Sequence, residues 1–127
     1  MTELTKLAVV FFGAGLGGVT RYLAGRMVAV DPGGFPWGTL AVNVTGCLAI
    51  GVVGAWLGGE RAEWLRLGLM VGVLGGYTTF SAFGKETVGL VESGRWGVAG
   101  AYVVASVVLG VAAVWVGAFL WEGGHVR

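Results

Sequence analysis

Charged residues are scarce in this chain. Of its 127 residues, 12% are Asp, Glu, Lys or Arg, whereas 56% are hydrophobic and the mean hydropathy is +0.83. A soluble domain of this length needs far more charge to cover its surface. The formal net charge is only +1, and the scattered basic residues form no electrostatic footprint for nucleic acid. We therefore predict an integral membrane protein that contacts membrane lipid and binds no nucleic acid.

Cysteine and histidine are almost absent. The single cysteine, Cys47, lies within an apolar run, so it cannot form an intrachain disulfide, and a cysteine-based metal site is not expected. We interpret Cys47 as a small packing residue. The single histidine, His125, lies in the C-terminal tail and cannot complete a Cys-His or Ser-His pair on a buried helix face. The sequence therefore predicts that the protein is not an enzyme.

Long apolar segments make up most of the chain. Each is long enough to cross a bilayer once, so both termini are expected on the same side of the membrane. The first apolar run is followed by Arg21 and Arg26 and by no Ala-x-Ala-like cleavage site, so it does not read as a signal peptide. We expect it to remain in the mature protein as the first helix. The prediction is an all-α, multi-pass fold with one transmembrane domain, 1–127, and four helices at about 4–30, 37–58, 64–91 and 96–121.

A polar stretch interrupts the third segment, from Gly75 to Glu86. Polar or irregular backbone at membrane depth is tolerated only where it is buried in protein or lines a path for something polar. The adjacent glycines Gly75 and Gly76 favour unwinding, and the threonines that follow can satisfy freed backbone groups. We therefore predict that the third helix is broken near its middle.

Glycines also recur at helical spacing. Gly68, Gly72 and Gly76 are four residues apart, and 13–18 in the first segment satisfies the pattern G-x-G-x-x-G. That dinucleotide fingerprint needs a strand, a helix and a second strand, which long apolar runs cannot supply. The glycines instead predict helices that approach one another closely.

The basic residues show no bias between the two sides of the membrane. Four are expected on the side of the termini (Lys6, Arg61, Arg66 and Arg127) and four on the other (Arg21, Arg26, Lys85 and Arg95). The positive-inside rule then favours neither orientation, so an antiparallel homodimer of dual topology is available. Arg21 is either an interfacial anchor or a functional residue.

Polar side chains within the predicted spans are neutral. Thr39 and Asn43 share a face of the second helix, and Tyr102 and Ser106 share a face of the fourth. Phe80 and Phe83 are three residues apart. Amide and hydroxyl donors, together with aromatic ring edges, can replace the water around a small anion without holding it too tightly. Helix–helix hydrogen bonding, buried core hydroxyls and ordinary aromatic packing remain the alternatives for these residues.

The carboxylates all fall at or near segment ends: Glu3, Asp31, Glu60, Glu63, Glu86, Glu92 and Glu122. A small proton-coupled exporter of cationic compounds with dual topology is the alternative function, and such exporters usually use a carboxylate inside the membrane. The absence of one weighs against that alternative. A third hypothesis is an accessory subunit whose polar residues only join helices.

Three stretches of this chain resemble the signature regions of the Fluc (CrcB) fluoride channels: Gly18-Val-Thr-Arg21-Tyr22, Gly38-Thr-Leu-Ala-Val-Asn43, and Gly75 to Phe83. The resemblance spans all four segments in order. It implies passive fluoride export, which lowers cytoplasmic fluoride, by an antiparallel homodimer with two pores in a prokaryotic plasma (cell inner) membrane. It also implies a structural Na⁺ at the dimer centre.

The resemblance further implies roles for particular residues. Phe80, Phe83 and Asn43 would line the pore, Thr79 would face the anion, and Arg21 would lie at the vestibule. Ser81 and Tyr102 would form a polar track with Ser106 beside it. The backbone carbonyls of Gly75 and Thr78 would hold the Na⁺, in agreement with the preference of hard cations for oxygen ligands. The chain departs from the family at Ala82, where a threonine is usual, and at Lys85, where a small residue is usual.

Overall fold

The fold consists of helices only, among the residues that the computed structural model describes: 1–28, 33–58 and 63–125. Four helical spans are long and apolar enough to cross a membrane, which confirms the prediction of a multi-pass, all-α protein. The third span, Glu63–Glu92, is built from four consecutive pieces. The elements are α1 (Glu3–Met27), α2 (Trp37–Trp56), α3 (Glu63–Leu65), the wide π-helix η1 (Arg66–Leu74), α4 (Gly75–Tyr77), α5 (Phe80–Glu92) and α6 (Trp96–His125).

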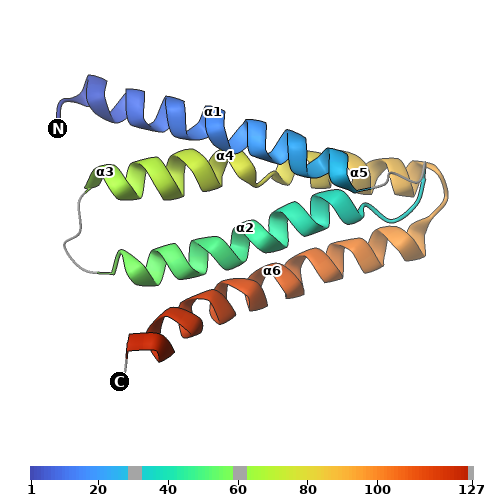
Figure 1. Cartoon of the computed structure of the whole chain (residues 1–127). Coiled ribbons are helices and arrows are strands. Elements are labelled where there is room, and N and C mark those ends of the chain that lie inside the picture. The colour runs from blue at the N-terminus through green and yellow to red at the C-terminus, as the bar shows by residue number, and fades with distance from the viewer. Residues whose placement is uncertain (29–32, 59–62, 126–127) are drawn as a thin grey trace.

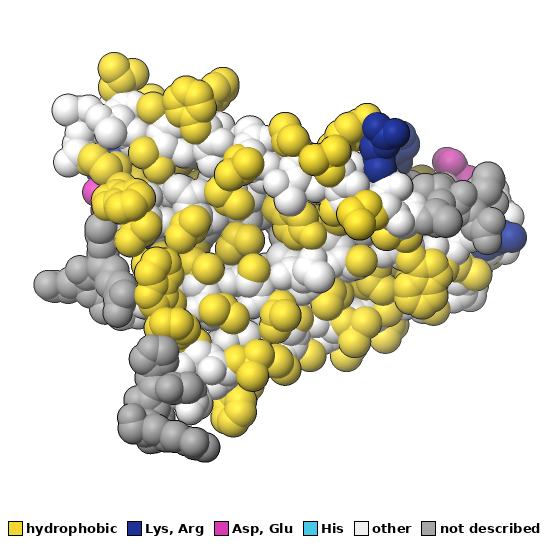
Figure 2. All heavy atoms as spheres, viewed as in Figure 1, with side chains coloured by type: hydrophobic (Ala, Val, Ile, Leu, Met, Phe, Trp, Pro, Cys, Tyr) yellow, Lys and Arg dark blue, Asp and Glu magenta, His cyan; other side chains and the backbone are white. Residues whose placement is uncertain are grey.

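The spans alternate in direction, so the start of α1 and the end of α6 lie at the same end of the molecule (Figure 1). Helix α2 packs along α6, and α1 packs along η1 and α4. Figure 2 shows hydrophobic side chains spread over the visible face, with charged ones toward its ends. Large apolar side chains such as Phe11, Phe12 and Trp115 are more than 70% exposed, as expected for a surface that faces lipid.

Glycine lets α1 and the third span touch through their backbones. A Cβ atom on Gly13 would lie 3.0 Å from the Cα of Gly72, and one on Gly17 would overlap the carbonyl oxygen of Val73. Gly76 packs in the same way on the carbonyl of Ala14. The prediction that the glycines serve close helix packing is therefore confirmed for Gly13, Gly17, Gly72 and Gly76, but not for Gly15 and Gly18, where a Cβ atom would meet nothing within 4 Å. Gly51 and Gly117 bring α2 and α6 together in the same way, although the sequence reasoning did not single them out.

The third helix is broken at Thr78 and Thr79. Both have extended backbones, with φ −80°, ψ 156° at Thr78 and φ −149°, ψ 116° at Thr79. The break was predicted, but the adjacent glycines are not its site, since Gly75 and Gly76 are helical. Gly76 is needed for contact with α1, whereas the backbone N–H and carbonyl of the extended Thr79 find their partner outside the helix, on Asn43. The Thr79 hydroxyl accepts from the Ala82 N–H at 3.2 Å and thereby caps α5.

The largest departures from the predicted helix ranges are at the ends of α1 and α6. Helix α1 ends at Met27 because Val28 is extended, with φ −100° and ψ 123°; positions 29 and 30 of the predicted range lie outside the described residues. Helix α6 continues past position 121 to His125. The bilayer limits the length of the apolar stretch, whereas a helix can continue into the polar interface.

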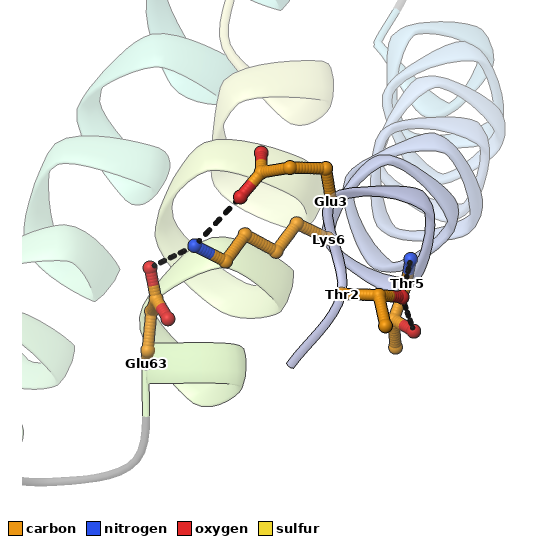
Figure 3. A network of polar contacts seen from close by, with 5 residues as sticks. All are labelled: Thr2, Glu3, Thr5, Lys6 and Glu63. Atoms are coloured by element: carbon orange, nitrogen blue, oxygen red, sulfur yellow. Dashed lines mark hydrogen bonds and ion pairs between the residues drawn. The ribbon is translucent and has the colours of Figure 1, made fainter.

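An ion-pair network fixes the end of the molecule that carries the termini (Figure 3). Lys6 Nζ lies 3.0 Å from an oxygen of Glu63 and 3.2 Å from one of Glu3, so it joins the first turn of α1 to the start of α3. Thr2 caps α1 by accepting from the Thr5 N–H at 3.3 Å. Among the four basic residues predicted for this side, Arg61 and Arg127 lie outside the described residues.

Candidate functional site

Two cavities meet at the break in the third span. The wide cavity, of about 910 Å³, lies at the end opposite the termini, between the connection before α2 and the end of α5. The narrow cavity, of about 330 Å³, is lined by residues from α2, η1, the break, α5 and α6. Thr79 lines both cavities. The break is therefore the place where the two cavities adjoin.

Asn43 on α2 binds the backbone of the break with both ends of its amide. Its Nδ2 donates to the Thr79 carbonyl at 2.9 Å, and its Oδ1 accepts from the Thr79 N–H at 2.8 Å. A broken helix leaves such groups without partners, and an unpaired backbone group at membrane depth is costly. Asn43 therefore joins α2 to the third span, and it also lines the narrow cavity.

At the break, the backbone N–H groups that would bond the carbonyls of Gly75 and Thr78 in a continuous helix have other partners. In a continuous helix the Thr79 N–H would donate to the Gly75 carbonyl, and the Ala82 N–H to the Thr78 carbonyl. Here these donors turn to Asn43 and to the Thr79 hydroxyl instead. Both residues line the narrow cavity, and carbonyl oxygens are ligands that a hard cation prefers. In the described part of the chain, no group of three or more His, Cys, Asp or Glu side chains could hold a metal.

Glu86 is a half-buried carboxylate that the sequence reasoning placed among the acids near segment ends. Its two oxygens accept from the Thr39 hydroxyl at 2.7 Å and from the Tyr102 hydroxyl at 2.6 Å. Helix α5 thus connects α2 to α6 at this point. The spacing in the sequence could have indicated this contact. Thr79 and Glu86 are two helical turns apart and lie on one face of the third span, and their partners Asn43 and Thr39 lie on one face of α2.

Three aromatic rings lie one beside the next between the narrow cavity and Glu86. The ring centroids of Phe80 and Phe83 are 5.3 Å apart, and those of Phe83 and Tyr102 are 5.2 Å apart. Tyr102 is fully buried, whereas Phe80 is 83% exposed. The row of rings therefore begins at the exposed Phe80 on the surface of the single chain and ends at Tyr102, which binds the carboxylate of Glu86.

The remaining predicted site residues fall on one cavity or the other. Ser106 lines the narrow cavity with Asn43, Phe80 and Phe83, and none of the described residues that line it is charged. Arg21 and Ser81 line the wide cavity, and Ser81 lies 3.3 Å from the Thr79 hydroxyl, oxygen to oxygen. Ala82 and Lys85, where the chain departs from the resemblance, also line the wide cavity.

Comparison with known families agrees with this arrangement. The family model described as CrcB-like protein, Camphor Resistance (CrcB), matches residues 8–118, a range that contains every predicted site residue. The chain belongs to the CrcB-like family. The match covers all four spans of this CrcB-like chain, so it concerns the whole fold and not a single motif.

Several relatives of this CrcB-like chain are named "Fluoride-specific ion channel FluC". The protein of Novosphingobium aromaticivorans is 47% identical, over 94% of this chain and 98% of its own length. The protein of Caulobacter sp. strain K31 is 45% identical, over 90% of this chain and 92% of its own length. The protein of Geobacter sulfurreducens is 47% identical, over 89% of this chain and 93% of its own length. The similarity therefore spans nearly the full length of each protein.

Proposed function

We propose that this chain is a fluoride channel that lets fluoride leave the cell passively and so lowers its cytoplasmic concentration. One observation carries the proposal. A narrow cavity lined by neutral donors and phenylalanine rings adjoins, at Thr79, a wide cavity that carries Arg21 and Lys85. Arg21 and Lys85 outnumber Glu86, the carboxylate that lines the same cavity, so net positive charge can gather anions at the wide mouth. Weak donors farther in bind an anion without trapping it, as conduction requires.

Each residue has a place in this path. Arg21 lies at the wide mouth, Ser81 and Thr79 follow at the break, and Phe80 and Phe83 line the narrow cavity with Asn43 and Ser106. Aromatic ring edges carry the positive part of the ring quadrupole and suit an anion. The Tyr102 hydroxyl donates a hydrogen bond to Glu86, and through that contact Tyr102 belongs to the proposed polar track.

The channel is proposed to be an antiparallel homodimer of dual topology in a prokaryotic plasma (inner) membrane. Phe80 is 83% exposed beside the narrow cavity, so a second copy is well placed to close that side. Arg21 and Lys85 both line the cavity away from the termini, which agrees with the equal division of basic residues between the two sides. An equal division permits insertion in both orientations.

A structural Na⁺ at the dimer centre completes the proposal. The carbonyls of Gly75 and Thr78 would hold it, because their usual helical donors bind Asn43 and the Thr79 hydroxyl. The exposed Gly75 lies on the open side of the single chain. The ion would supply positive charge where carbonyl dipoles from two copies converge.

The other two functions have less support. A proton-coupled exporter of cationic compounds finds no match in the names of the relatives, which are ion channels. The same names agree with the prediction that the chain is not an enzyme. An accessory subunit would not need neutral donors and phenylalanines grouped around one cavity.

Reconstitution into liposomes loaded with fluoride or chloride tests the function. A fluoride electrode should record rapid passive efflux, and a chloride electrode should record almost none. Equal efflux of both anions would contradict the proposal. Uptake of a cation driven by a proton gradient would favour the exporter instead.

A further inference from the structure

Tyr77 forms a second connection between α2 and the break, on the other side from Asn43. Its hydroxyl oxygen lies 2.9 Å from that of Thr45, which is two residues after Asn43 on α2. Tyr77 is the last residue of α4, directly before the extended residues Thr78 and Thr79. Two residues of α2 therefore bind the chain just before the break and within it.

The direction of the Tyr77 bond follows from the proton count. The Thr45 hydroxyl lies 2.7 Å from the carbonyl of Ala41 and 3.1 Å from that of Val42, and a carbonyl can only accept. Its one proton is thus used within α2, so Tyr77 must donate to Thr45. The result is a relay in which Tyr77 donates to Thr45 and Thr45 donates to its own helix backbone.

Gly46, between Asn43 and the end of α2, packs directly against Tyr77 and Thr78. A Cβ atom there would overlap the methyl group of Thr78 and lie 3.2 Å from Cδ1 of Tyr77. On the opposite side, a Cβ atom on Gly17 of α1 would lie 2.8 Å from the Tyr77 nitrogen. Tyr77 is therefore held between α1 and α2, with its hydroxyl bond as the directional contact.

The position of the pair makes this bond hard to replace. Tyr77 is the 15th of the 30 residues of the third span, and Thr45 is the ninth of the 20 residues of α2, so both lie near mid-membrane. A tyrosine hydroxyl that loses its acceptor there has no bulk water to bind. Interhelical hydrogen bonds inside membranes contribute a measurable, though modest, part of the packing free energy.

We propose that Tyr77 is a positioning residue: its bond to Thr45 fixes where α4 ends and so holds Thr79 and Phe80 in register with Asn43. Asn43 sets the height of Thr79, and the close contact of Gly17 with the Tyr77 backbone sets the distance between α1 and α4. The Tyr77 hydroxyl bond adds the directional contact that ties the end of α4 to α2. The inference rests on the proposed function only in its last step, since the fluoride path is what the register serves.

Amide hydrogen exchange in lipid nanodiscs measures the register without any transport assay. Tyr77→Phe and Thr45→Val should each speed exchange of the Thr78, Thr79 and Ala82 amides by about threefold to about twentyfold, the range expected for one membrane hydrogen bond. Exchange in α1 and α6 should not change. The double variant should match either single one, because both remove the same bond. Thr45→Ser, which keeps the hydroxyl, should exchange like the parent.

Two variants on α1 serve as matched controls. Tyr22→Phe removes a hydroxyl from an exposed tyrosine whose ring lies under Arg26, and Thr20→Val removes one that binds its own helix at Leu16. Neither should change exchange at the break. Unchanged exchange in Tyr77→Phe, or effects of the two single variants that multiply in the double one, would overturn the inference.

Fluoride efflux on the same variants separates this inference from the proposed function. Parent protein that conducts no fluoride contradicts the function, while the exchange data still decide the inference. If the parent conducts, Tyr77→Phe should lower the rate per protein while the fraction of liposomes that hold active protein stays constant. A loss confined to that fraction would indicate a folding defect and would overturn the positioning role.

Discussion

The first half of the third span packs through its backbone, with the Tyr77 side chain adding a hydrogen bond at its end, whereas the second half is held by side-chain hydrogen bonds. Gly72 and Gly76 lie directly against Gly13 and Ala14 of α1. After the break, Thr79 and Glu86 take their partners from α2 and α6. Where two backbones touch, there is no room for an added side-chain atom. Where side chains form the contact, as at Thr79, cavities lie beside them. The two halves of the third span are therefore held in the bundle by different kinds of contact.

Adding one methyl group to the backbone contact should have the largest effect. Gly17→Ala would place its Cβ against the Val73 carbonyl, where neither backbone can yield, so we expect a loss of about 3 kcal/mol or more in stability. Size-exclusion chromatography and thermal unfolding in detergent measure it. Gly15→Ala adds the same methyl to the same helix in open space and should behave like the parent. Equal stability of the two variants would break the contrast between the halves.

Removing the amide at the break should affect conduction more than folding. Asn43→Ala leaves the N–H and the carbonyl of Thr79 without partners, at about 1–3 kcal/mol for each group. Thr79 adjoins both cavities, so a part of this cost of only about 1.36 kcal/mol that appears as a barrier to ion passage would slow fluoride efflux from liposomes about tenfold, and we expect at least that. Leu48→Ala, a truncation elsewhere on α2, should conduct like the parent. An Asn43→Ala protein that conducts normally would contradict the role of the break.

The smallest effect is expected at the carboxylate. Glu86→Gln keeps one accepting oxygen but replaces the other with an amide that cannot accept, so either Thr39 or Tyr102 loses its partner. A loss of about 1.5–3 kcal/mol in stability follows from one hydrogen bond to a charged group. Thermal unfolding of Glu86→Gln beside Glu92→Gln, which changes an exposed residue of α5, measures the difference. A larger shift in Glu92→Gln would contradict the account.

Much of the fold could be predicted because membrane-spanning helices leave clear patterns. Long apolar runs marked the four spans, and glycines at helical spacing marked the contact of α1 with the third span. Asn43 and Thr39, four residues apart, were predicted to share a face of α2, and from that face both bind the third span. These features depend on local periodicity, which a single sequence records.

The features that were missed depend on contacts between distant residues. The break lies at Thr78 and Thr79 because Asn43 offers partners there, and not where adjacent glycines make unwinding easiest. Glu86 was assigned to a segment end, but its hydrogen bonds to Thr39 and Tyr102 place it inside the bundle. Such choices are made by tertiary partners, which outweigh local backbone preference.

The central claim is that the neutral donors and rings beside the break select fluoride. It is tested most directly by the zero-current potential of the parent protein in a planar bilayer, with fluoride on one side and an equal concentration of chloride on the other. A selective pore predicts a large potential of the sign set by fluoride permeation. A zero-current potential near zero would mean that both anions pass equally, and would contradict the claim.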